Sequence, residues 1–194
     1  MLLKLSQWLI LIFFTEIHDE DERLLCIYGC EQLLYTAVST LGLLIQGVLM
    51  NAGVESILII IIFYLCQSRG GGFHASSHIK CFFTMAIGLF IGLFMLQIPI
   101  IQLILPYIGL ISSIILYKVP LCLHHNKQYL RQNIHQLKVC SYLTTTEVLL
   151  FLILMMLSGF KHFFQAGCMA MLLSAISRLY AAKKQKGQLT SRVS

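Results

Sequence analysis

The segment from residue 67 to residue 81, QSRGGGFHASSHIKC, is the stretch whose residue types indicate chemistry. Its three consecutive glycines are poor helix interior, since each costs about 1 kcal/mol against alanine, and they leave the backbone free to turn. We therefore predict that one helix ends at the glycines and that the next begins near Cys81. The connection would present His74 and His78, and a histidine with a cysteine could form a general base and a nucleophile.

The distance between His74 and Cys81 decides whether they can act together. On an unbroken helix they would share a face but lie roughly 10.5 Å apart along the axis. A general base must lie within about 3 Å of its nucleophile, or one water away. His74 must therefore lie on irregular backbone and fold back over Cys81, which the glycines permit. The start of a helix and the neighbouring Lys80 would favour a thiolate at Cys81.

Metal binding is an alternative use of the same segment. His74, His78 and Cys81 have the spacing H-x3-H-x2-C, which could supply three ligands. His124 and His125, further along the chain, could complete such a site. The segment lacks the glutamate of the zinc-protease helix motif, and three flexible glycines would not hold metal ligands in a fixed geometry. We therefore favour a nucleophilic cysteine over a metal site and predict no cofactor.

The composition indicates the environment in which these residues lie. Of the 194 residues, 58% are hydrophobic and only 11% are charged, against about 25% charged residues in a soluble domain. This balance excludes an ordinary soluble globule and a disordered chain. The net charge of +6 fits the basic bias of cytoplasmic loops, and no basic groove with interleaved aromatic residues suggests a nucleic-acid partner. We predict an all-α polytopic membrane protein forming one domain, 1–194.

Apolar runs and their interruptions predict about six transmembrane helices in three hairpins, since a span needs about 20 residues. The expected helices are 24–50, 56–66, 82–98, 101–119, 143–159 and 163–180. Turns are expected at Asn51, Pro99 and Gly159, and a capping box from Thr144 to Glu147 would open the fifth helix. The helical bundle would thus cover 24–180, followed by a basic tail, 181–194.

The N-terminal residues 1–23 need a separate interpretation. Their apolar stretch is too short to span a membrane, and no small-residue cleavage site of a signal peptide follows it. We predict an amphipathic helix at the membrane interface, anchored by Trp8 and Lys4.

Positive charges gather in alternate loops. The segments 67–81 and 119–142 and the C-terminal tail hold most of the lysines and arginines, while the opposite turns hold only Lys161. This asymmetry predicts a cytoplasmic location for both termini and for the segment 67–81.

The run Arg69-Gly70-Gly71-Gly72-Phe73-His74-Ala75, followed by Cys81, resembles the signature of the accessory gene regulator B family. These are integral membrane cysteine endopeptidases of Gram-positive quorum-sensing systems. The resemblance in size and helix arrangement extends over nearly the whole chain. Within the motif, His74 matches the catalytic histidine of the family and Cys81 its nucleophile. Arg69 and Gly72 match positions that shape the site.

The resemblance implies a substrate and a reaction. An AgrD-like precursor peptide would lose its acidic C-terminal tail through an acyl-thioester on Cys81, and its core would cyclise to a thiolactone or lactone. It also implies a homodimer in the bacterial cell membrane, in contact with lipid. The basic residues that could attract the tail are Lys80, Lys127, Arg131 and Lys138. Glu147 could bind the substrate or Arg69, although we prefer a role as helix cap.

Two other classes of function stay open on the sequence. One is a small transporter, but Glu55 and Glu147 lie at predicted helix ends rather than inside a proton path. The other is an adaptor without catalytic activity, in which His74 and Cys81 would be dispensable.

Overall fold

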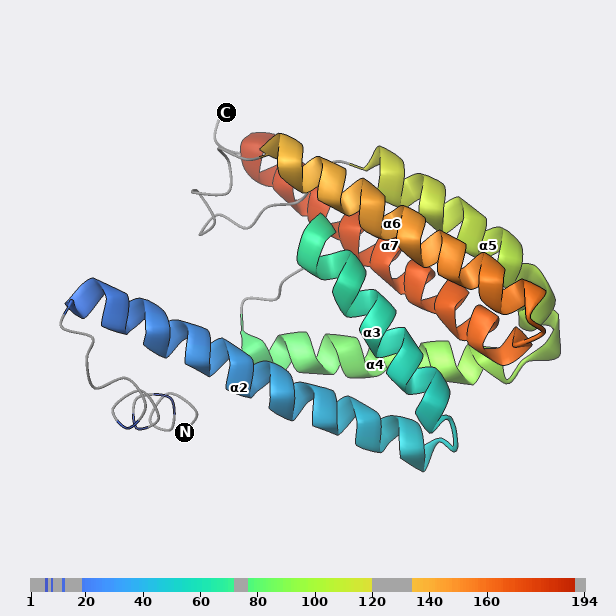
Figure 1. The fold of residues 1–194 in the computed structure, drawn as a ribbon, viewed down its shortest axis with the longest axis horizontal. Helices are drawn as coiled ribbons and strands as arrows, with labels where there is room; N and C mark the ends of the chain where they lie inside the picture. The colour runs from blue at the N-terminus through green and yellow to red at the C-terminus, as the bar shows by residue number, and fades with distance from the viewer. Residues whose placement is uncertain are drawn as a thin grey trace. The chain divides into compact units, whose positions relative to one another are not determined.

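The structure, a computed structural model, describes residues 6, 8, 12, 19–71, 77–119 and 134–190. Its long elements are six α-helices, shown in Figure 1, and the described residues contain no β-strand. The helices are α2 (Glu20–Leu49), α3 (Gly53–Gly70), α4 (His78–Leu96), α5 (Pro99–Lys118), α6 (Ile134–Leu157) and α7 (Lys161–Thr190). Among the described residues, five helices are long and apolar enough to cross a membrane, and α3 is not one of them. The predicted all-α polytopic membrane fold is confirmed.

The chain forms two compact units, Met1–Ile45 and Gln46–Ser194. The first unit holds most of α2, whose apolar side chains, such as Leu33 and Leu41, are largely exposed. Ser6, Trp8 and Ile12 are helical, and Trp8 and Ile12 are exposed. The remainder of the predicted interfacial helix, including Lys4, lies outside the described residues.

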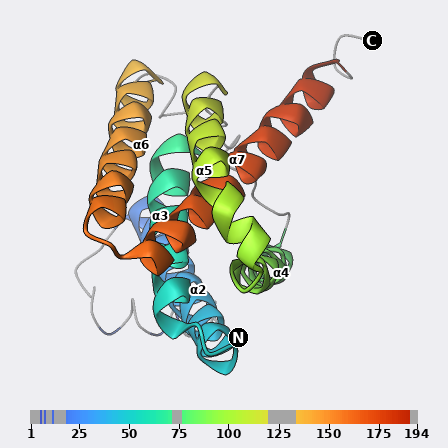
Figure 2. The same ribbon diagram turned by 90° about the vertical axis from the view of Figure 1, so that its right-hand side faces the viewer.

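The second unit is built around α7, which packs against α3, α4, α5 and α6. Figure 2 shows α6 and α5 on either side of α3, with α7 running diagonally across the view and α4 seen nearly end-on. Half of the membrane-length stretch of α7 is buried. Its buried residues include Ala166, Ala170 and Ala175, whose small side chains let neighbouring helices approach closely.

Two glycines mark close approaches of α5 and α6 to α7. A Cβ atom on Gly109 of α5 would lie 2.7 Å from Sγ and 3.1 Å from Cβ of Cys168 on α7. A Cβ atom on Gly167 of α7 would lie 2.1 Å from Leu152 on α6. The absence of a side chain at these two positions therefore sets how closely α5 and α6 pack against α7.

The three short turns fall where the sequence predicts them. Asn51 has a φ of 55°, and the N–H of Ala52 donates to Gly47 O at 2.9 Å, which reverses the chain after α2. Pro99 occupies the first turn of α5, where its missing N–H costs nothing. Gly159, with a φ of 80°, lies between α6 and α7.

The predicted capping box is wrong. Helix α6 begins at Ile134, so Thr144 and Glu147 lie inside it rather than at its start. The hydroxyl of Thr144 donates to Cys140 O at 2.9 Å, and that of Thr145 donates to Ser141 O at 2.9 Å. Threonines that bond the carbonyl four residues earlier are compatible with helix interior, so α6 includes residues 134–142 before them.

Helix α7 also extends beyond the predicted span 163–180, since it ends at Thr190. The residues from 181 to 186, AAKKQK, are strong helix formers. The basic segment that we expected as a tail therefore begins inside this helix.

Proline 106 interrupts the hydrogen bonding of α5 in its first half. A proline has no N–H to donate to the carbonyl four residues earlier, which is that of Gln102. Nε2 of Gln165 on α7 donates to this carbonyl at 3.4 Å. Gln102 in turn donates its own Nε2 to Leu96 O at the end of α4, at 2.6 Å. Side-chain amides thus satisfy backbone groups that lipid could not.

We predict that Gly109→Ala destabilises the second unit by about 1–3 kcal/mol, because the new methyl group must displace the backbone-fixed Cβ of Cys168. Thermal unfolding of the detergent-solubilised protein measures the effect. Gly88→Ala is the matched control, since its Cβ would meet only Leu173 at 3.7 Å. Equal melting temperatures for the two variants would contradict this account of α5–α7 packing.

Candidate functional site

The connection between α3 and α4 breaks the helix where the glycines predict. Helix α3 ends at Gly70, and Gly71, with a φ of 67° and a ψ of 168°, donates its N–H to Gln67 O. This positive φ is easily adopted by glycine. The structure describes the chain again from Ser77. Gly72, His74 and the side chain of His78 lie outside the described residues, so the predicted pairing of His74 with Cys81 stays a prediction.

Cys81 lies in the first turn of α4. The extended Ser77 is the N-cap: its side chain accepts from the N–H of Lys80 at 3.3 Å, and its carbonyl accepts from the N–H of Cys81 at 3.0 Å. The Cys81 side chain is half-buried, and Lys80 beside it is exposed. The prediction that a helix begins near Cys81 is thus confirmed. The thiol lies at the N-terminal end of α4, where backbone N–H groups lack partners within the helix.

Arg69, in the last turn of α3, makes contacts that join α3 to α6. Its NH1 donates to Oγ1 of Thr144 at 3.0 Å and lies 3.9 Å from Oε2 of Glu147. Of the roles considered for Glu147, the helix cap is therefore wrong and the pairing with Arg69 is found. The Glu147 side chain is 68% exposed, and exposed ion pairs contribute little energy, so the Thr144 bond is the stronger constraint on Arg69.

The other predicted basic residues are divided between described and undescribed parts of the chain. Lys138 is exposed on α6, whereas Lys127, Arg131, His124 and His125 lie outside the described residues. Among the residues that are described, no cluster of three His, Cys, Asp or Glu could hold a metal ion. The alternative metal site, which uses His74 and His78, is not tested by this result.

Arg178 is a residue that the sequence analysis missed. It was counted among the charges of the C-terminal region, but its side chain is only 2% exposed. NH1 donates to Leu116 O of α5 at 2.5 Å, and NH2 donates to Oγ of Ser141 on α6 at 2.9 Å. The available signal was its place between apolar residues in AISRLY, because an ionisable residue in a span indicates a buried partner.

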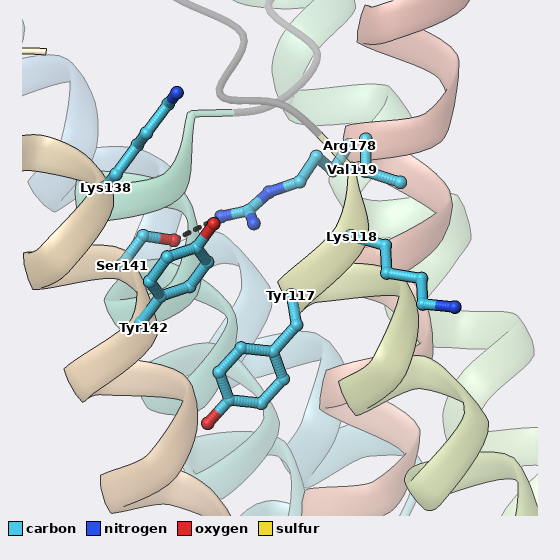
Figure 3. A pocket seen from close by; sticks show the side chains of 7 residues that line it. All are labelled: Tyr117, Lys118, Val119, Lys138, Ser141, Tyr142 and Arg178. Atoms are coloured by element: carbon cyan, nitrogen blue, oxygen red, sulfur yellow. Dashed lines mark hydrogen bonds between the residues drawn. The ribbon is translucent and has the colours of Figure 1, made fainter. Parts of the chain in front are cut away.

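These contacts border a pocket of about 150 Å³ between the end of α5, the first turns of α6 and Arg178 of α7, shown in Figure 3. Tyr117 and Tyr142 stack beside it with ring centroids 5.6 Å apart. Lys118 and Lys138 project from either side, and the guanidinium of Arg178 lies between the two helices that carry them. The pocket is thus rich in cations.

The fold and the candidate residues define a class: a polytopic helical membrane protein with a cysteine at the start of a helix that follows a glycine-broken connection. The family model of accessory gene regulator B matches residues 3–178. The chain therefore belongs to the accessory gene regulator B family, which acts in the processing of quorum-sensing peptides. Searches of curated proteins and of solved structures gave no match.

We predict that Arg178→Met lowers the free energy of unfolding by about 1–3 kcal/mol. The variant removes the charged donor that hydrogen-bonds to the Leu116 carbonyl and the Ser141 hydroxyl in the interior of the bundle. Thermal unfolding in detergent measures the loss. Lys183→Met is the control on the same helix, since Lys183 is exposed. If both variants melt at the wild-type temperature, Arg178 does not hold the three helices together.

Proposed function

We propose that this protein is a membrane cysteine endopeptidase that cleaves a quorum-sensing precursor peptide and promotes its cyclisation. The observation that carries the proposal is the position of Cys81 in the first turn of α4, inside the region that matches the family. His74 precedes it in a connection whose glycines allow the backbone to fold back. Such a pair is the usual requirement of thiol-based acyl transfer.

The first step is attack by Sγ of Cys81 on the carbonyl carbon of the peptide bond between the core and the tail. His74 accepts the thiol proton and then donates it to the leaving amine. The carbon–nitrogen bond breaks, the tail leaves with a free amino terminus, and the core stays attached to Cys81 as an acyl-thioester. The proposed step requires no cofactor, because His74 transfers the proton and Cys81 takes up the acyl group.

The second step returns the enzyme to its starting state. A thiol or hydroxyl within the core attacks the thioester carbonyl, closes a thiolactone or lactone, and releases Cys81 as a thiol. Thiol exchange keeps the acyl group activated provided that water is excluded. Placement of the site at a membrane surface favours this exclusion. The positive charges near residues 67–81 support a cytoplasmic location for the site and for both termini.

Basic residues would guide an acidic tail toward the thiol. Lys80 is adjacent to Cys81, and Lys138 is exposed on α6. With Lys127 and Arg131 they would attract an acidic peptide over about a Debye length, roughly 10 Å at moderate salt. Arg69, held by Thr144 and paired with Glu147, would fix the end of α3 from which the connection with Gly72 and His74 departs.

We predict that Cys81→Ala and His74→Ala each reduce the rate of tail release by about 10³-fold or more. A nucleophile and its base act as a unit, so that loss of either one abolishes most of the catalysis by the pair. Co-expression with the candidate precursor peptide, followed by mass spectrometry of membranes, measures tail loss and cyclisation. Cys140→Ala is the matched control, because Cys140 is an exposed cysteine on another helix. Tail removal by Cys81→Ala would refute the cysteine mechanism and favour the metal alternative.

A second prediction concerns Arg69. Because its side chain is 48% exposed, Arg69→Met should change stability by no more than about 1 kcal/mol, yet it should reduce tail release at least tenfold by freeing the end of α3. Processing and thermal unfolding are measured on the same preparation. Full activity in this variant would show that Arg69 does not shape the site, while an equal loss of stability and activity would make its role structural.

A further inference from the structure

We propose that the pocket between α5, α6 and α7 binds the phosphate of an anionic glycerophospholipid. This inference does not depend on the peptidase function, because lipid binding needs neither Cys81 nor His74, although Lys138 belongs both to this pocket and to the residues proposed to attract the substrate tail. The pocket has a volume of about 150 Å³, enough for a small charged group rather than a peptide side chain with its backbone. The ligand is therefore inferred from the charge of the side chains that line the pocket and from the residues around its opening.

The positive charge of the lining residues favours an anionic ligand in the pocket. Lys118, Lys138 and Arg178 supply three cationic groups, and none of the described residues that line the pocket carries a carboxylate. Two hydrogen bonds fix the guanidinium of Arg178, which is 2% exposed. The two lysines are exposed, and in Figure 3 their side chains point away from the space between the two tyrosines. Their long, flexible side chains would turn toward an anion bound at the opening. Charge-assisted hydrogen bonds to phosphate are about twice as strong as neutral ones.

The place of the pocket along three helices indicates its depth in a membrane. Each of these helices is long and apolar enough to cross a membrane, and the residues that line the pocket lie near one end of each apolar span. Tyr117 and Tyr142 stack beside it, and Tyr117 also hydrogen-bonds to Thr146. Tyrosines are enriched at the boundary between hydrocarbon and water. A phosphate bound here would stand level with the headgroups of the surrounding bilayer.

Exposed apolar side chains continue from the pocket toward the middle of the helices. On α5, Leu110 and Ile114 precede Lys118 at steps of four residues, and their side chains are 59% and 47% exposed. On α6, Leu150 follows Tyr142 two such steps later and is 62% exposed. Residues four apart share a helix face, so these side chains would contact acyl chains below a bound phosphate. An acidic peptide tail would use only the cations, which favours a lipid.

The test uses the purified full chain in detergent, with dioleoyl phosphatidylglycerol and dioleoyl phosphatidylcholine as probes. Native mass spectrometry gives the affinity of each lipid. We expect the anionic lipid to bind at least tenfold more tightly than the zwitterionic one. The double variant Lys118→Ala/Lys138→Ala should weaken binding of the anionic lipid by about tenfold or more, since each basic residue near an anionic headgroup contributes to the binding free energy. The control Lys161→Ala/Lys183→Ala removes two exposed lysines outside the pocket lining and should bind as wild type does.

Other outcomes would overturn the proposal. Equal affinity for the two lipids, or equal weakening by both double variants, would mean that the pocket does not recognise a headgroup. Competition by inorganic phosphate as strong as that by the lipid would assign the site to a soluble anion. If a synthetic acidic peptide binds wild type but not Lys118→Ala/Lys138→Ala, while the lipid binds both equally, the pocket serves a peptide instead.

Discussion

The buried guanidinium of Arg178 is the polar contact on which the arrangement of α5, α6 and α7 at one end of the second unit depends. A charge in a bundle of membrane-length helices is costly unless its donors find acceptors. Here one acceptor is a carbonyl in the last turn of α5 and another is a hydroxyl on α6. The same bonds that lower the cost of burying Arg178 therefore fix three helices against one another.

Helix α6 connects this contact to the connection that precedes Cys81. Ser141 accepts from Arg178, and Thr144, one turn further along the same helix, accepts from Arg69. Two arginines from α3 and α7 thus bind hydroxyls on neighbouring turns of α6. Because Arg69 lies in the last turn of α3, immediately before the glycines, the position from which the connection departs depends on the packing of α6. A disturbance at Arg178 would be transmitted to that position through one short stretch of helix.

Much of this fold follows from the sequence, and the exceptions have physical reasons. Apolar runs, three turn signals and a glycine break predict all six helices and place Cys81 at a helix start, although only five of the six are long and apolar enough among the described residues to cross a membrane. The capping box at Thr144 failed because a threonine can satisfy its hydroxyl inside a helix as well as at its end. The burial of Arg178 was missed because charge counting treats every arginine beside a tail as solvated. Its acceptors lie 37 and 62 residues away in the chain, where no local pattern reveals them.

The bond from Gln165 to the carbonyl opposite Pro106 has a mechanical consequence when it is considered together with Arg178. The two contacts join α5 to α7 at Gln102 and at Leu116, about 21 Å apart along α5. Sliding of either helix by one residue, about 1.5 Å, would break both bonds at once, and rotation about either axis would break at least one. The two bonds therefore oppose both sliding and rotation of α5 against α7.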